Sequence, residues 1–257
     1  MTLTYVESVF DICKMVAGTS QVKRLPVRRP SDGASLGDGP ILGRGALPVL
    51  PPLGELLPGG LPRGTVTAVG GWGLLCLALA AGASAAGAWC AVAGVPQIGV
   101  TAAAGVGLDP DLMLVVPDLG AGWPQVVISL LDGCELVLLR PPDRPSAGVR
   151  RRLEASLRRC GGVLVVAGDW AGAQARLFVA RQEWAGIGTG HGRLRGRRAQ
   201  VVADGRGSAA RPRSCWLWLP GPDGSVGPAA PPVGLDGSVG QAAPAGKAAG
   251  QDMRDAG

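Results

Sequence analysis

The chain has 257 residues, of which 47% are hydrophobic and only 4% aromatic, so it can bury a sizeable core built mainly from aliphatic side chains. Its net charge of +6 comes almost wholly from arginine, and it contains one histidine and six cysteines without a C-x-x-C pair. This composition excludes a histidine-rich metal centre. It also argues against a disulfide framework or a zinc site, so we expect reduced, mostly buried thiols and no bound metal.

The first 46 residues are predicted to form a mobile N-terminal arm. A short helix is expected over residues 6–16, followed by a polar stretch rich in Pro and Gly over residues 26–46. The N-terminus shows no basic segment followed by an apolar one, which a secretory signal peptide would need. We therefore expect a cytoplasmic protein.

Residues 64–108 contain no Asp, Glu, Lys, Arg or His. Within them, residues 74–95 form an uncharged run that is long enough to span a membrane. This run is rich in Ala and Gly, however, and neither an aromatic belt nor a tight basic cluster flanks it. A parallel sheet that is buried on both faces gives the same kind of run, so we prefer a buried α/β core, with no membrane contact, and keep a membrane-associated protein as an alternative.

Strand-like and helix-like patterns alternate from residue 66 to residue 166. This alternation predicts an α/β fold with a mainly parallel sheet, right-handed crossovers and helices on both faces. The expected strands are 66–69, 88–93, 112–116, 135–139 and 163–166, and the expected helices are 74–86, 99–105, 123–132 and 146–159.

The pattern changes after residue 168, where short strands follow one another without helices, at 176–180, 199–203 and 215–219. They predict an antiparallel C-terminal extension on the edge of the sheet. The α/β domain is accordingly placed at residues 47–220. Residues 221–257 are rich in Gly, Pro and Ala and repeat the segment Asp-Gly-Ser-Val-Gly, so they are predicted to be a disordered tail.

A glycine turn, Gly70-Gly71-Trp72-Gly73, joins the first expected strand to an apolar helix. This order of elements is typical of a phosphate-binding loop, which needs the pattern G-x-x-x-x-G-K-[ST]. The chain contains no such pattern, and Trp72 stands where phosphate would lie. The strand 135–139 should end in an acid that orients Mg²⁺, but it ends in Arg140. We therefore predict a degenerate loop, no nucleotide cofactor and no ATP hydrolysis.

Arginine is concentrated between residues 140 and 213, where 16 Arg accompany 5 acidic residues. Residues 150–152 and 158–159 lie about two helical turns apart and are expected to share one exposed helix face. The candidates for DNA contact surround the late strands: Arg193, Arg195, Arg197, Arg198, Arg206, Arg211 and Arg213. Such a cluster suits a phosphate backbone. A solvated basic face, enriched in arginine by the codon usage of a GC-rich genome, explains the same composition.

Residues 184–192 are dense in glycine and include Trp184 and His191. We expect a flexible turn here, or else a loop that allows the backbone to approach a partner closely. Trp184 is the aromatic side chain that the sequence suggests for base stacking beside the arginine cluster.

Several segments together resemble a known family. Residues 59–71, Gly-Gly-Leu-Pro-Arg-Gly-Thr-Val-Thr-Ala-Val-Gly-Gly, look like the beginning of the ATPase core of RecA-type recombinases, and segments at 87–93, 105–117 and 134–140 follow in the order of that core. With a late block over 188–198, 205–207, 210–213 and 217–224, they resemble the RecA-like accessory protein of the actinobacterial damage-inducible mutagenesis cassette, the ImuA-prime type.

This resemblance spans residues 47–224 and implies a RecA-like fold with a non-catalytic role in DNA-damage tolerance. Proteins of this type act in SOS-induced translesion synthesis and mutagenesis, beside a catalytically inactive Y-family polymerase-like protein and an error-prone replicative-type polymerase. It implies a cytoplasmic, nucleoid-associated protein that binds this polymerase-like partner, with single-stranded or damaged DNA and self-association as further candidates.

The departures from recombinases are heavy. The phosphate-loop lysine and hydroxyl are absent, and the acids expected around Gly94 and at Arg140 are replaced. No nucleotide-binding residue of recombinases can therefore be transferred to this chain. The alternative function, a divergent DNA-dependent ATPase of the RecA type, would have to use other residues.

Overall fold

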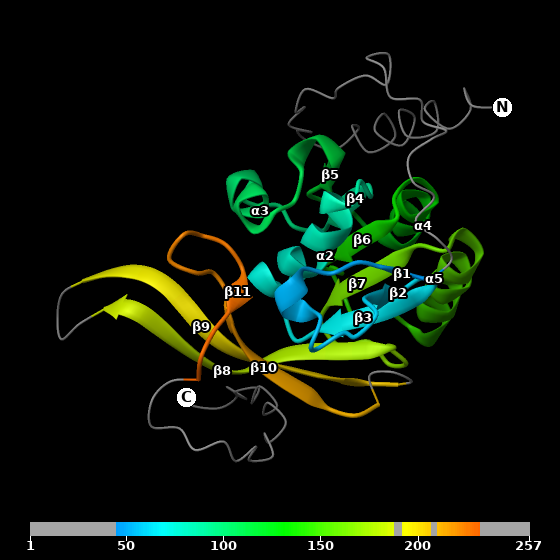
Figure 1. Ribbon diagram of the computed structural model, residues 1–257. Coiled ribbons are helices and arrows are strands. Elements are labelled where there is room, and N and C mark those ends of the chain that lie inside the picture. The colour runs from blue at the N-terminus through cyan, green and yellow to red at the C-terminus, as the bar shows by residue number, and fades with distance from the viewer. Residues whose placement is uncertain (1–44, 188–191, 207–209, 232–257) are drawn as a thin grey trace, which may run out of the picture.

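The computed structural model describes residues 45–187, 192–206 and 210–231 (Figure 1). The predicted arm, except for its last two residues, and the chain from residue 232 onward lie outside the described residues. The described segments form one α/β domain around a central sheet.

The central sheet has nine strands within this described part, in the order β11-β10-β9-β8-β3-β7-β6-β4-β5. Its parallel half comprises β3 (Thr65–Val69), β4 (Cys90–Ala93), β5 (Met113–Val116), β6 (Leu136–Leu139), β7 (Val163–Ala167) and the beginning of β8 (Ala175–Ile187). Its antiparallel half is formed by β8, β9 (Gly192–Gly205), β10 (Arg213–Trp218) and β11 (Gly227–Pro228). The predicted α/β fold class, a mainly parallel sheet with an antiparallel C-terminal extension, is thus confirmed.

Helices cover both faces of the parallel half. The α2 face is packed by α2 (Leu74–Ala85), α3 (Val100–Val106) and the segment that runs from β1 (Ala46–Leu47) through the 3-10 helix η1 (Pro51–Leu53) to β2 (Leu61–Pro62). The α5 face is packed by α4 (Trp123–Gly133) and α5 (Ala147–Cys160). A second 3-10 helix, η2 (Pro110–Leu112), precedes β5.

The uncharged stretch 64–108 is explained by this packing. It forms β3, α2, β4 and α3, and every residue of β4 is buried. Strands that are covered on both faces read as continuous apolar runs because neither side chain direction reaches water. None of the helices in the described part of the chain is long and apolar enough to cross a membrane.

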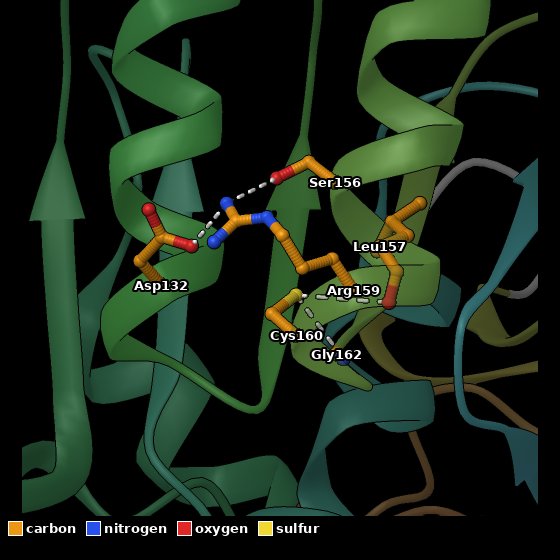
Figure 2. Close-up of polar contacts among 6 residues, drawn as sticks. All are labelled: Asp132, Ser156, Leu157, Arg159, Cys160 and Gly162. Carbon is orange, nitrogen blue, oxygen red and sulfur yellow. Dashed lines mark hydrogen bonds and ion pairs between the residues drawn. The ribbon is translucent and has the colours of Figure 1, made fainter.

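Two side-chain contacts join the basic helix α5 to α4. Arg152 donates to the side chain of Gln125, and Arg159 donates to Asp132 at 2.9 Å, where it also reaches Ser156 (Figure 2). The two contacts are seven residues apart on each helix, so α4 and α5 run in the same direction, as helices that connect parallel strands on one face do. These two arginines therefore contribute to the contact between helices.

The folded domain extends beyond the expected limit at residue 220, so a disordered tail that begins at residue 221 is wrong for residues 221–231. Strand β11 pairs with the end of β10, and the backbone N–H of Ala229 donates to Trp216 O. The intervening turn is closed locally, because the Asp223 carboxylate accepts hydrogen bonds from the backbone and hydroxyl of Ser225. Short-range composition gave no sign of this pairing.

Candidate nucleic-acid interface

The glycine turn after β3 is tied to the neighbouring strand. The N–H of Gly70 donates to Leu177 O on β8 at 2.8 Å, and a side chain at position 70 would meet Phe178 at 3.1 Å. Trp72 is half-buried and packs against the core of the α2 face. The first N–H of the turn is thus used within the sheet, and the predicted place of phosphate is next to a packed indole.

The end of β4 cannot carry the acidic side chain that a RecA-type ATPase would need there. Gly94 has φ +76°, and a Cβ at this position would lie 2.1 Å from Arg140 O. The N–H of Arg140 donates to Ala93 O at 2.9 Å, so the ends of β4 and β6 are joined through their backbones. Only glycine fits at position 94 without a backbone shift.

Beyond the helices, β8 and β9 continue as a long hairpin that projects from the domain (Figure 1). Val179 is opposite Val201, but the next pair is Arg181 and Gln200, so Ala180 is an extra residue in β8. A bulge of this kind reverses which side chains face each side of the sheet. After Ala180, the even-numbered residues of β8 therefore lie on the face that the odd-numbered residues occupy before it.

On the α2 face of the hairpin, Arg197 is fixed beside Trp184. Its Nε donates to Leu219 O at 2.7 Å and its Nη1 to the side-chain oxygen of Gln182 at 3.2 Å. Its guanidinium lies 5.5 Å from the centroid of the Trp184 ring, within the range of a cation–π contact. Burial lowers the pKa of Arg197, although an arginine remains charged at neutral pH.

On the α5 face, the adjacent residue Arg198 contacts an acidic residue and another tryptophan. Its Nη2 lies 3.1 Å from the Glu183 carboxylate, and its guanidinium lies 5.6 Å from the centroid of the Trp218 ring. Each face of the sheet thus carries one arginine–tryptophan pair here, Arg197 with Trp184 inside the hairpin and Arg198 with Trp218 of β10. Of these two arginines, Arg198 on the α5 face is the one that contacts an acidic side chain, Glu183.

The seven arginines proposed for DNA contact fall into two groups. Arg195, Arg197 and Arg198 are together near the hairpin tip, where Arg193 also belongs to β9 although its side chain is outside the described residues, as is His191. The second group is exposed at the opposite end of β9 and at the beginning of β10: Arg206, Arg211 and Arg213. Arg213 pairs with Ala203, and Ala203 lies six residues from Arg197 along β9. The two groups are therefore roughly 20 Å apart.

Sequence reasoning placed Trp184 in a turn, but it lies on β8, and residues 188–191 of the expected turn are outside the described residues. It also missed Trp216 and Trp218, which are half-buried on the α5 face of β10. The alternation with the buried Leu217 and Leu219 is the signal that could have placed them there, because side chains alternate between the faces of a strand.

The five cysteines in the described part of the chain are free thiols. Burial raises the pKa of Cys76, Cys90 and Cys134 to about 12 in each case. Across the described ranges, no cluster of three or more His, Cys, Asp or Glu side chains could hold a metal ion. The arginine–tryptophan hairpin is therefore the functional candidate.

The family model described as the MT3502 N-terminal domain matches residues 55–172, which end just before β8. Among curated proteins, the uncharacterised protein Rv3395c from Mycobacterium tuberculosis (strain ATCC 25618 / H37Rv) is 36% identical over 165 residues, which cover 60% of this chain and 81% of the relative.

Two solved structures align with parts of this chain. The flagellar accessory protein FlaH from Methanocaldococcus jannaschii aligns with a TM-score of 0.46 and 10% identity, over 64% of this chain and 89% of that protein. The KaiC-like protein PH0186 from Pyrococcus horikoshii OT3 aligns with a TM-score of 0.49 and 14% identity, over 72% of this chain and 99% of that protein.

Proposed function

The chain belongs to the protein family that includes Rv3395c of Mycobacterium tuberculosis, and we propose that it is a non-catalytic, RecA-like accessory factor in DNA-damage tolerance. In this proposal it binds nucleic acid through the hairpin formed by β8 and β9. It also binds a Y-family polymerase-like protein of the translesion-synthesis machinery.

The observation that carries the DNA-binding part is the arginine–tryptophan hairpin. Arg195, Arg197 and Arg198 lie on a ribbon that projects from the domain, two of them beside indole rings. Arginine side chains bind phosphate oxygens with charge-assisted hydrogen bonds, and exposed indoles stack on bases. The edge where β8 and β9 leave the sheet beside β10 thus brings cationic and aromatic side chains together, which suits it to contact nucleic acid.

The non-catalytic part is supported by the ends of β3, β4 and β6. The turn after β3 holds Trp72 and no lysine, position 94 accepts only glycine, and β6 is followed by Arg140. Phosphoryl transfer depends on a cation at the phosphates and on acids that hold Mg²⁺. Three separate positions therefore argue against ATP hydrolysis.

The role in translesion synthesis and the polymerase-like partner rest on the family resemblance of residues 47–224. The test is a pull-down from DNA-damaged cells, with the full chain as bait and a chain that ends at residue 231 as the matched control. We expect a polymerase-like protein to be enriched after damage with the full chain. If neither bait enriches a protein of the replication or repair machinery, the proposed cellular role is wrong.

The DNA-binding part is tested by the salt dependence of affinity. A variant with Ala at Arg195, Arg197 and Arg198 should bind a single-stranded oligonucleotide more weakly, and its plot of log affinity against log salt should be flatter by about 0.7 for each lost phosphate contact. The matched control removes three exposed arginines outside the hairpin, Arg144, Arg151 and Arg158. An equal effect of both triple changes would show that only overall charge matters and would refute a site at the hairpin.

A further inference from the structure

The two faces of the hairpin tip differ in charge. Gln182, Trp184 and Arg197 share the α2 face through their mutual contacts, and Arg195, two residues from Arg197 on the same strand, is exposed on that face. The two acidic residues of the hairpin, Glu183 and Asp204, pair with Arg198 and Arg176 on the α5 face. In the described residues, the strands thus give the α2 face of the tip two positive charges and no carboxylate.

The turn that follows β10 carries an acidic residue outside the strands of the hairpin. Asp223 is the acidic residue of that turn, and its carboxylate accepts hydrogen bonds from Ser225 inside the turn. Pro220 and Gly221, rather than Asp223, are the residues that a side chain at Gly196 would meet first. Hydrogen bonds from Ser225 lower the pKa of Asp223, so its carboxylate stays charged, but it lies on this turn and not on the strands of the hairpin.

Trp184 is the large hydrophobic side chain that the described structure leaves exposed, with 48% of its surface accessible. The bulge at Ala180 is what places it on the basic face, opposite Arg197. Arg197 is held by a backbone carbonyl and by Gln182, so it supports the indole from one side in a fixed orientation. An indole that is held in place loses little conformational entropy when a ligand stacks on it.

We propose that this face binds single-stranded nucleic acid by stacking one unpaired base on Trp184, with Arg195 contacting the adjacent phosphate and Arg197 acting as a positioning residue for the indole. This inference rests on the proposed function and specifies the strand type and the face of the hairpin. In a duplex, each base is covered by its neighbours, whereas an unpaired base offers a free face to an aromatic side chain.

The experiment measures fluorescence anisotropy of labelled oligonucleotides with the full chain. The probes are a thymidine oligomer of about 20 nucleotides, an abasic oligomer of the same length and a duplex. A length of about 20 nucleotides exceeds the usual footprint of single-strand-binding modules. We expect Trp184→Ala to weaken binding of the thymidine oligomer at least about fivefold while leaving abasic binding unchanged, since it removes only stacking. Trp184→Phe should retain most of the wild-type affinity, because a phenyl ring can also stack on a base. A hairpin that misfolds when Trp184 is replaced would lose affinity in both variants.

A second pair of variants tests how much charge contributes to binding. Arg195→Ala should weaken binding of both the thymidine and the abasic oligomers, because both carry phosphates. Arg181→Ala removes the same charge from the α5 face of the same hairpin and should leave both affinities unchanged.

Equal binding by the wild type and Trp184→Ala, or equal losses in Arg181→Ala and Arg195→Ala, would overturn the inference while leaving DNA binding intact. If the wild-type chain binds none of the three probes, the proposed DNA-binding function itself fails.

Discussion

Replacing Gly94 with alanine tests why the end of β4 carries no acidic side chain. The φ of +76° costs an L-residue roughly 1–2 kcal/mol. The new Cβ would also lie 2.1 Å from Arg140 O, where an ordinary contact is above about 3.4 Å, so the backbone of β4 or β6 must move. Crowding of this kind costs about 1–3 kcal/mol. We therefore expect Gly94→Ala to destabilise the protein by about 2–5 kcal/mol.

Gly120→Ala is the matched control. Gly120 also has a positive φ, +59°, but nothing lies within 4 Å of a Cβ at this position. This variant should therefore lose only the conformational part, about 1–2 kcal/mol. Urea denaturation of both variants, followed by circular dichroism and compared at equal m-values, gives the difference. If Gly94→Ala is no less stable than Gly120→Ala, an acid could be accommodated at this position, and the steric argument against it is wrong.

Two further predictions concern the core. Trp170 is fully buried and its Nε1–H donates to the Glu154 carboxylate at 3.0 Å, so Trp170→Phe should lower the free energy of unfolding by about 1–2 kcal/mol in urea titrations; an unchanged midpoint would show that this bond contributes nothing. Burial raises three thiol pKa values to about 12, so the stability they contribute is complete below about pH 9 and is lost as the pH rises toward 12. Urea titrations at pH 8 and pH 10 should show a fall that disappears in a variant with alanine at all three positions: Cys76, Cys90 and Cys134.

The parallel half of the fold could be predicted from the sequence because its signals are local. Continuous apolar runs such as β6 (Leu136–Leu139) can be buried on both faces only in a sheet covered by helices. The short partner strand β11 could not be predicted, since Gly227 and Pro228 become a strand only by pairing with β10. Composition alone assigned these residues to a disordered tail.

The sequence identified the arginines of the site but not their arrangement. Arg197 and Arg198 are adjacent in sequence, yet they lie on opposite faces beside different tryptophans. Which face Trp184 joins depends on the bulge at Ala180, and a one-residue bulge has no composition signature. The contact of Arg159 with Asp132 joins residues 27 apart, so no local pattern could separate this arginine from those available to a ligand.

The central claim, nucleic-acid binding that does not depend on nucleotide, is tested most directly by titrating the full chain with ATP and Mg²⁺ in the absence and presence of the single-stranded oligonucleotide. The account predicts no ATP binding in the micromolar range and an oligonucleotide affinity that is the same with and without Mg-ATP. Micromolar, Mg²⁺-dependent binding of ATP, or an oligonucleotide affinity that changes when Mg-ATP is added, would contradict it.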